Sequence, residues 1–445
     1  MYTSCARTGV GSRGAQAVAR RFATVQPITT TARNHRVVVV GNGSAGVALS
    51  HQLLRKGTFA QDDIAVIDPA KWHHYQPGWT LVGGGLKSKE DLRTPIDQLV
   101  NSKLKFYNEQ VVEFHPDENS VSLVNGDTIH YDQLVVAPGV KVDYDSVKGL
   151  PGAMADSDGL VSSIYSYDYC DKAFRNIRRM KKGSAIFTQP SGIVKCAGAP
   201  QKIMWLALDH WRRAGLYEDE PDSSAIDVTF ATGLPTMFGV PKYSAKLDEL
   251  RKERGVEGLF EHNLVSIDGN TATFARPAGE EPVHRHFDFL HVAPRNVPHA
   301  FVKESELSNE AGFVDVDQHS LRHKKWKNVW SIGDASSLPT SKTVAAITSQ
   351  APVLTANILR SLEGKGPLGD YDGYTSCPLL TGEKKVLLAE FKYGGVPKET
   401  FNQWFGIDQA IPRRAFYHLK KDFFPWVYNR FHIKGQWGGP RGWMR

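Results

Sequence analysis

Short runs of aliphatic residues recur along this chain and predict buried strands. Val37–Val40 is a run of valines, and Ile64–Ile67, Ser184–Thr188 and Val329–Ile332 are similarly apolar. Runs without polar alternation are typical of parallel strands that are covered on both faces. Val47–Arg55, which follows the first run, is predicted to be a helix. Strands that alternate with helices in this way predict an α/β fold.

A glycine-rich turn joins the first predicted strand to the first helix. Gly41, Gly43 and Gly46 stand in G-x-G-x-x-G order. In such a turn the first glycine permits a tight bend, the second lets backbone approach a diphosphate, and the third lets helix and strand pack closely. Asp68 ends the next strand about 20 residues on, where a carboxylate can hold a ribose hydroxyl. These residues predict a dinucleotide site, and a glycine-rich turn with a capping aspartate is the alternative.

The two halves of the chain share an outline. Val111–Phe114 and Val121–Val124, the second followed by Asn125-Gly126, predict a β-meander. The pattern D-x-L-x-V-A-P then occurs at 132–138 and again at 288–294. Related halves predict an internal duplication, and a chance likeness of two buried strands is the alternative.

The second half lacks a phosphate turn of its own. A helix is predicted over Ile164–Met180, ahead of the strand at Ser184–Thr188. The chain then runs through Gln189–Pro200, which contains Cys196 but no G-x-G-x-x-G motif. This pattern argues against a nicotinamide dinucleotide in the second half.

The N-terminal stretch differs in composition from the rest. The chain has 445 residues and a net charge of +7, and its length predicts two or three domains. No acidic residue occurs from Met1 to Gln61, where serine and threonine accompany Arg7, Arg13, Arg20, Arg21 and Arg33. This composition is typical of a mitochondrial transit peptide, so residues 1–34 are expected to be removable. A disordered basic tail is the alternative.

The four cysteines differ in their predicted settings. Cys5 falls in the leader, and Cys170 is spaced with Phe174 and Ile177 as a buried helical residue. Cys196 precedes a predicted helix start and follows Lys195, and both features favour a thiolate. Cys377 lies between an aromatic, glycine-containing loop and a proline, which suggests an exposed setting. Spacing alone does not show whether the last two cysteines act together.

The C-terminal stretch, residues 412–445, mixes basic and aromatic residues. Lysines and arginines alternate with Phe416, Leu419, Phe423, Val427 and Phe431 at near-helical spacing. Pro425 is expected to divide the stretch into two short helices. Such segments lie on anionic lipid rather than cross it, and no apolar run reaches the roughly 18 residues of a spanning helix. Core packing is the alternative; nucleic-acid binding lacks any supporting motif.

Several of these segments together resemble the mitochondrial sulfide:quinone oxidoreductase family. The resemblance runs from about His35 to the C-terminus, and the segments that contain Cys196 and Cys377 are the most specific. The matching segments are the glycine turn, Tyr75-Gln76-Pro77, 194–202, Gly333-Asp334, 338–343, 371–378 and 435–440.

The resemblance implies an α/β fold with two tandem Rossmann-like domains, as in glutathione reductase, and a C-terminal amphipathic membrane-attachment region. FAD is expected in the first domain, and the second is expected to lack an NAD site. The implied segments are the leader 1–34, the first part of the FAD-binding domain 35–150, the second domain 151–316, the second part of the FAD-binding domain 317–375, and a quinone and membrane region 376–445.

The resemblance also implies roles for individual residues. Cys196 and Cys377 would be a redox pair, with Lys202 and Lys420 near the reactive centre. No metal site is implied. Ala335 and Pro138 depart from residues that relatives often carry, and Pro138 leaves the flavin contact at its turn open. The implied FAD-binding residues are Gly41, Gly43, Ser44, Ala45, Gly46, Asp68, Gln76, Val112, Asp334, Lys342, Thr343, Val344 and Ala345.

The implied reaction is the oxidation of hydrogen sulfide. Hydrosulfide would attack a bridge between Cys196 and Cys377, direct or through an extra sulfur, at Cys377. Cys196 would leave as a thiolate and attack the flavin. A small acceptor such as glutathione or sulfite would take the sulfur, and ubiquinone the electrons. The expected location is the matrix face of the inner mitochondrial membrane, with no nucleic-acid partner.

Other functions stay open at this point. A type II NADH:quinone dehydrogenase shares the fold, but it would need a glycine-rich turn after Phe187 and has no use for Cys196. A soluble sulfide dehydrogenase that reduces a cytochrome does not account for the leader or the amphipathic tail. A non-catalytic FAD-binding redox sensor is an alternative of a different class.

Overall fold

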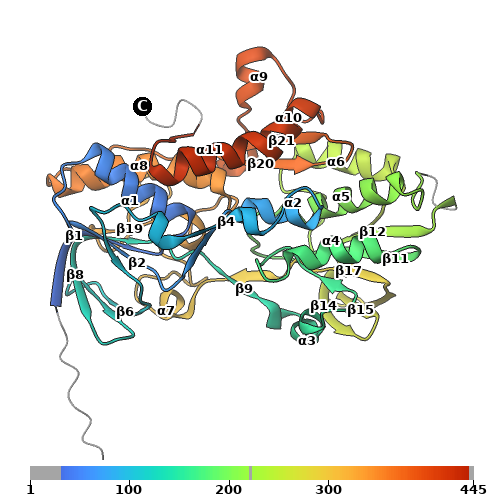
Figure 1. Cartoon of the computed structure of the whole chain (residues 1–445), viewed down its shortest axis with the longest axis horizontal. Coiled ribbons are helices and arrows are strands. Elements are labelled where there is room, and N and C mark those ends of the chain that lie inside the picture. The colour runs from blue at the N-terminus through green and yellow to red at the C-terminus, as the bar shows by residue number, and fades with distance from the viewer. Residues whose placement is uncertain (1–31, 220–222, 440–445) are drawn as a thin grey trace, which may run out of the picture.

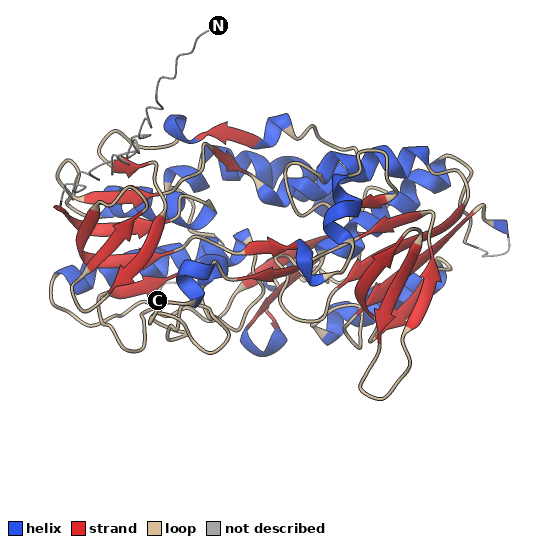
Figure 2. Cartoon of the chain, turned by 90° about the horizontal axis from the view of Figure 1, so that it is seen from below, coloured by secondary structure: helices blue, strands red, loops and turns tan. Residues whose placement is uncertain are grey.

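The computed structural model describes residues 32–219 and 223–439. Two sheets, each with a core of parallel strands, follow one another along the long axis of the molecule. A layer of helices covers one side of both (Figure 1). The C-terminal helices, coloured red, lie on the outside of that layer and extend from the first half toward the second. Figure 2 shows the strands of the two halves at opposite ends of the molecule.

The first sheet combines parallel strands with a meander. β8 pairs with β1 and β19 in parallel and with β7 antiparallel, so it belongs to both parts. The sheet is made by β5 (Lys105–Tyr107), β2 (Ile64–Ile67), β1 (Ala32–Val40), β8 (Thr128–Val136), β19 (Val329–Ser331), β7 (Ser120–Leu123) and β6 (Val111–His115). The predicted strands and the Asn125-Gly126 hairpin are confirmed.

Helix α1 (Ser44–Lys56) packs along α8 (Val344–Leu362) over this sheet. Leu49 and Leu53 of α1 and Leu354 of α8 belong to the same buried core as the valines of β1. The first helix and the last long helix therefore close one hydrophobic core. Smaller elements in this half are β3 (Trp72–His74), β4 (Arg93–Pro95) and α7 (Ala300–Lys303), whereas α2 (Trp79–Gly83) and α3 (Leu150–Ala155) pack against elements of the second half.

The second sheet repeats this plan. It has five parallel strands, and a separate three-stranded meander comes before the last of them, β17, in the chain. The first D-x-L-x-V-A-P segment overlaps the end of β8, and the second contains β17. The second half comprises β10 (Val161–Ser162), α4 (Cys170–Arg179), β11 (Gly183–Gln189), α5 (Ala199–Arg213), β12 (Ile226–Thr232), α6 (Pro241–Glu253), β13 (Glu257–Phe260), β14 (Asn263–Asp268), β15 (Thr271–Ala275), β16 (Val283–His286) and β17 (Phe289–His291). A short ladder of β9 (Lys141–Asp143) and β18 (Arg295–Val297) lies between the halves.

The C-terminal region adds a small sheet and a row of short helices. A π-helical turn, Leu419–Phe423, precedes Pro425 of α11, so the helices on either side of it are continuous rather than separate. Proline has no N–H to donate, and a π turn accommodates that gap. The elements are β20 (Thr375–Leu380), β21 (Val386–Lys392), β22 (Val396–Pro397), α9 (Thr400–Phe405), α10 (Arg414–His418), α11 (Phe424–Arg430) and a 3₁₀ turn at His432–Lys434.

Two predicted boundaries differ from the structure. The helix expected at Ile164–Met180 begins only at Cys170. The Ser163 hydroxyl accepts from the backbone N–H of Tyr165, and such local bonds compete with helical ones. The expected leader lies outside the described residues except for 32–34, which pair with β8 from Thr128 onward. The sheet thus begins before the predicted boundary.

None of the helices in the described ranges is long and apolar enough to cross a bilayer. This agrees with the expectation from the sequence.

The three glycines of the first turn have separate structural roles. Gly41 has φ +98° and a Cβ there would lie 2.5 Å from Ala137 O, while a Cβ on Gly46 would overlap Gly41 O. Nothing lies within 4 Å of a Cβ on Gly43. The first and third glycines are therefore needed for packing, and the second leaves open space.

This difference predicts unequal effects on stability. Gly46→Ala forces α1 away from β1 and lowers the free energy of unfolding of the FAD-free protein by about 1–3 kcal/mol. Gly43→Ala, the matched control, changes it by less than about 0.5 kcal/mol. Denaturant unfolding of both variants measures this difference, and equal losses would contradict the assignment.

Candidate active site

Cys196 and Cys377 lie 181 residues apart in the chain, yet their Sγ atoms are 4.0 Å apart. Cys196 is in the loop before α5, and Cys377 is in β20. Gly198 permits this approach, because a Cβ there would come within 2.6 Å of Cys377 Sγ. A disulfide needs about 2.05 Å, so the structure shows two unbonded sulfurs within easy reach of each other.

The backbone at Cys196 is held in an uncommon conformation. Its φ is +54°, in the left-handed region that non-glycine residues rarely adopt. Such a conformation costs on the order of 1–3 kcal/mol and persists only where neighbours hold it. Here the N–H of Cys196 donates to Lys342 O at 2.9 Å, and its carbonyl accepts from Ala199 N at 2.8 Å. The cysteine is thereby fixed between the loop that precedes α8 and the first turn of α5.

The two thiols differ in acidity. The S–H of Cys377, followed by the charges of Lys202 and Lys420, lowers the pKa of Cys196 well below its usual value. Lys202 Nζ lies 3.3 Å from Cys196 Sγ. Donation of that hydrogen bond to Cys196, together with burial, raises the pKa of Cys377 well above its usual value. Cys196 is therefore the thiolate and Cys377 the thiol.

Two expectations about these cysteines are wrong. The cation beside Cys196 is Lys202, one turn into α5, because Lys195 Nζ points away and donates to Gln76 Oε1 at 2.9 Å. Cys377 is not in an exposed loop, since it lies in β20 and is only 2 % exposed. Cys170 is fully buried, as predicted.

Both lysines expected near the centre are there. Burial alone would lower the pKa of Lys202, but the Cys196 thiolate raises it. Lys420 Nζ donates to Pro77 O at 3.0 Å, and burial followed by the charge of Lys202 lowers its pKa to about 8. Lys202 thus stays charged at neutral pH, whereas Lys420 can exchange a proton near pH 8.

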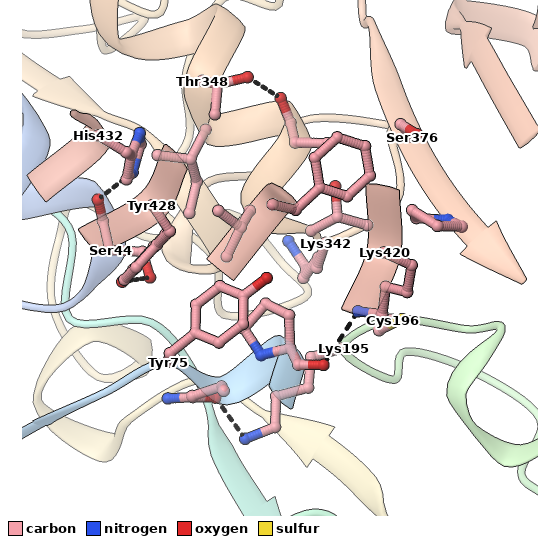
Figure 3. A pocket seen from close by; sticks show the side chains of 18 of the residues that line it. Ser44, Tyr75, Lys195, Cys196, Lys342, Thr348, Ser376, Lys420, Tyr428 and His432 are labelled. Atoms are coloured by element: carbon pink, nitrogen blue, oxygen red, sulfur yellow. Dashed lines mark hydrogen bonds between the residues drawn. The ribbon is translucent and has the colours of Figure 1, made fainter. Parts of the chain in front are cut away.

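A cavity of about 590 Å³ extends from the glycine turn past Cys196 to the C-terminal helices. Figure 3 shows Ser44 at one side of it and Cys196 and Lys420 at the other. Lys195, Lys342 and Asp334 also line this cavity. Burial raises the pKa of Asp334, and it lowers the pKa of both Lys195 and Lys342 to about 8.

The residues around the turn fit a bound FAD. Helix α1 has Gly43 as its N-cap, no side-chain cap and no acidic residue in its first turn, so its N–H groups face the cavity unneutralised. This is the usual arrangement for a diphosphate. Nothing lies within 4 Å of a Cβ on Gly43, so the backbone at this position is open to a diphosphate.

Most of the predicted FAD-binding residues converge on the cavity, and four of them have other roles. Asp68 accepts from Asn42 N at 2.5 Å and Ala70 N at 2.8 Å, so it braces the glycine turn. Val112 is exposed at a bulge of β6 and does not line the cavity, and Gly41 and Gly46 shape the turn. The predicted residues that line the cavity are Gly43, Ser44, Ala45, Gln76, Asp334, Lys342, Thr343, Val344 and Ala345.

The far end of the cavity is apolar. Its lining there comes from α9, the π-helical turn and α11, through Phe401, Trp404, Leu419, Phe423 and Val427. Trp404 and Phe423 are also 55 % and 39 % exposed on the outer surface. The same side chains therefore border both the cavity and the solvent.

Tyr428 and His432 are among the cavity residues that the sequence analysis missed. Both lie beside Ser44 and come from the C-terminal stretch (Figure 3). Their spacing resembles that of the other aromatic residues in that stretch, so nothing in the sequence separates them from the surface-facing set.

Comparison with known proteins agrees with this site. Residues 35–182 match the pyridine nucleotide-disulphide oxidoreductase family. The chain is 45 % identical over 92 % of its length to the mitochondrial sulfide:quinone oxidoreductase of Schizosaccharomyces pombe, and 92 % of that protein is covered. It is 37 % identical to the mouse counterpart over 92 % of this chain and 89 % of that protein. The crystal structure of the Aquifex aeolicus sulfide:quinone oxidoreductase superposes with a TM-score of 0.74 at 17 % identity, covering 92 % of this chain and 93 % of that one.

A glycine turn under a Rossmann-like sheet, a duplicated second half and a cysteine pair define an FAD-dependent oxidoreductase of the two-dinucleotide-binding-domain class. The identities to full-length relatives narrow this further. The chain belongs to the sulfide:quinone oxidoreductase family.

The role of Lys202 can be tested through the thiolate. Lys202→Met removes the cation from Cys196 and raises the pKa of this thiol, so the rise of the alkylation rate of the reduced protein with pH moves to higher pH by about one pH unit for each pKa unit. Lys202→Arg keeps the charge and is the matched control. Alkylation rates against pH measure the shift, and an unchanged profile in Lys202→Met would contradict this electrostatic role.

Proposed function

We propose that this chain oxidises hydrogen sulfide at Cys196 and Cys377 and delivers the electrons through FAD to ubiquinone. The observation that carries the proposal is the buried sulfur pair, 4.0 Å apart beside Lys202, on a cavity that runs from the dinucleotide turn to an apolar end. Sulfide oxidation with quinone reduction is also the activity in the names of the full-length relatives.

The difference in pKa between the thiols of Cys196 and Cys377 determines which sulfur hydrosulfide attacks. In exchange reactions the thiol with the lower pKa leaves faster. Hydrosulfide therefore attacks Cys377 of the bridged pair, the S–S bond breaks, and Cys196 leaves as a thiolate next to Lys202. Cys377 then carries the persulfide, and the atoms balance with no further reagent.

The remaining chemistry needs a cofactor and an acceptor. FAD, when bound, takes up the electron pair and passes it to the quinone. Cys196 lines the cavity and is positioned to deliver electrons there, while a small acceptor such as glutathione or sulfite removes the outer sulfur from Cys377. Return of the pair to its bridged form completes the cycle.

A nicotinamide-dependent activity is disfavoured by the second half. In an NAD-binding domain, the helix after the first strand presents its N-terminus to a diphosphate. Here the corresponding helix, α5, follows a loop without the glycine motif, and its first turn adjoins Cys196 instead. Cys196 therefore occupies the position at which a glycine turn would bind the diphosphate of a nicotinamide dinucleotide.

The apolar end of the cavity suggests how a quinone arrives. Trp404, Phe405, Phe423 and Trp426 are exposed on α9, the π-helical turn and α11, which project from the same edge in Figure 1. Basic side chains of the same stretch, such as Arg430, suit anionic lipid. This surface would lie on the inner mitochondrial membrane at the matrix face, and quinone would enter between its aromatic residues.

Flavin absorbance tests the reaction itself. Sulfide is expected to bleach the flavin absorbance of the purified protein, and a soluble ubiquinone analogue is expected to restore this absorbance. Cys196→Ser keeps the FAD but lowers turnover by at least about 10³-fold, since the leaving thiolate is lost. Cys170→Ser, at a buried cysteine outside the cavity, is the control. No bleaching of the unmodified protein would end the proposal.

Membrane attachment is tested separately with vesicles of anionic phospholipid. Replacing Trp404 and Trp426 together by Ser weakens sedimentation with the vesicles by about tenfold or more, because both rings leave the interface. Leu368→Ser removes a similarly exposed side chain, 67 % exposed, away from this surface and leaves binding unchanged. Equal binding by the double variant would contradict this membrane surface.

A further inference from the structure

The last part of the chain returns to the first turn. We define the C-terminal strap as residues 424–437, which comprise α11, the 3₁₀ turn and the three residues after it. It lies against α1: Gln52 Nε2 donates to Trp437 O at 3.2 Å, and a Cβ on Gly435 would lie 2.5 Å from Gln52 N. Figure 3 shows Tyr428 and His432 of the strap beside Ser44.

Tyr428 ends a directed chain of hydrogen bonds from the glycine turn. His73 Nδ1 lies 3.1 Å from Asn42 O, which can only accept, so Nδ1 carries the proton. His73 Nε2 therefore accepts from the Tyr428 hydroxyl at 2.7 Å, and the Tyr428 oxygen accepts from Ser44 Oγ at 2.6 Å. Burial lowers the pKa of His73, which is consistent with a neutral ring. Two residues of the turn, Asn42 and Ser44, are thus tied to the strap through one hydroxyl.

His432 offers a second contact. Its Nε2 donates to Ser44 O at 3.1 Å, so Nδ1 of the neutral ring is an acceptor. Burial lowers the pKa of this imidazole to about 4. The ring lines the cavity, while Nδ1 itself is covered by neighbouring atoms and has no partner among the described residues. His432 therefore fixes Ser44 from the cavity wall through Nε2.

We propose that the C-terminal strap completes the FAD site and holds the cofactor in place. Tyr428 is a positioning residue that fixes Ser44 and the turn, and His432, which holds Ser44 O and lines the cavity, packs against the FAD chain. FAD cannot leave past this wall while Ser44, Tyr428 and His73 stay joined, so release requires the strap to loosen. This assigns cofactor retention to residues nearly 400 positions from the turn, 384 between Ser44 and Tyr428.

FAD release from the intact, loaded protein tests the proposal. Tyr428→Phe keeps the ring but leaves Ser44 and His73 without their shared partner, and release, followed by the fluorescence of free FAD, becomes about tenfold faster. His432→Leu keeps the approximate volume and accelerates release similarly. Asn429→Ala, at the exposed neighbouring position of α11, is the matched control and releases FAD at the rate of the unmodified protein.

Further readouts separate retention from folding and from catalysis. If Tyr428→Phe is purified without FAD, the dissociation constant on adding FAD back replaces the rate and is about tenfold higher. Its thermal unfolding midpoint without FAD is compared with that of the Asn429→Ala control, and a midpoint that rises as FAD is added shows that the variant folds. Wild-type release rates in both Tyr428→Phe and His432→Leu would overturn the proposal, as would equally fast release from Asn429→Ala. None of these readouts uses sulfide, so their failure is distinct from failure of the sulfide reaction.

Discussion

A thiolate and an ammonium group buried side by side are the constraint on which this molecule depends. Taking Cys196 and Lys202 out of water separately is costly, and their 3.3 Å contact is what makes both charges tolerable. That contact requires α5 to begin beside β20, and it requires Gly198 to have no side chain. The left-handed backbone of Cys196, held by Lys342 O, completes the fit. The second half of the chain thereby supports a reactive sulfur instead of a second dinucleotide.

Three kinds of surface line one continuous cavity. Beside Ser44, α1 presents bare N–H groups; on the other side Cys196 lies next to Lys202; and aromatic side chains of the C-terminal helices line the wall together with Lys420. In the proposed reaction, sulfur and electrons separate by position: the sulfur stays on Cys377 of β20, whereas the electrons leave from Cys196, which lines the cavity.

The sequence predicted those features of the fold that depend on residues close to one another in the chain. The valines of β1, the glycine turn and the hairpin at Asn125-Gly126 were readable, because strand burial and turn geometry are local. The convergence of two cysteines 181 residues apart was available only through the family resemblance. The cation beside Cys196 was misassigned to Lys195, because adjacency in sequence does not give direction, and one helical turn placed Lys202 there instead. Cys377 was wrongly expected to be exposed, since pairing of β20 with β21 decides its burial.

The strap sets an order on how the protein matures. The turn at Ser44 is made early in synthesis, whereas its partners Tyr428 and His432 are made last. Under the strap proposal, a chain still emerging from the ribosome has the glycine turn but not the residues that retain the cofactor. Stable loading of FAD then requires synthesis of the whole polypeptide.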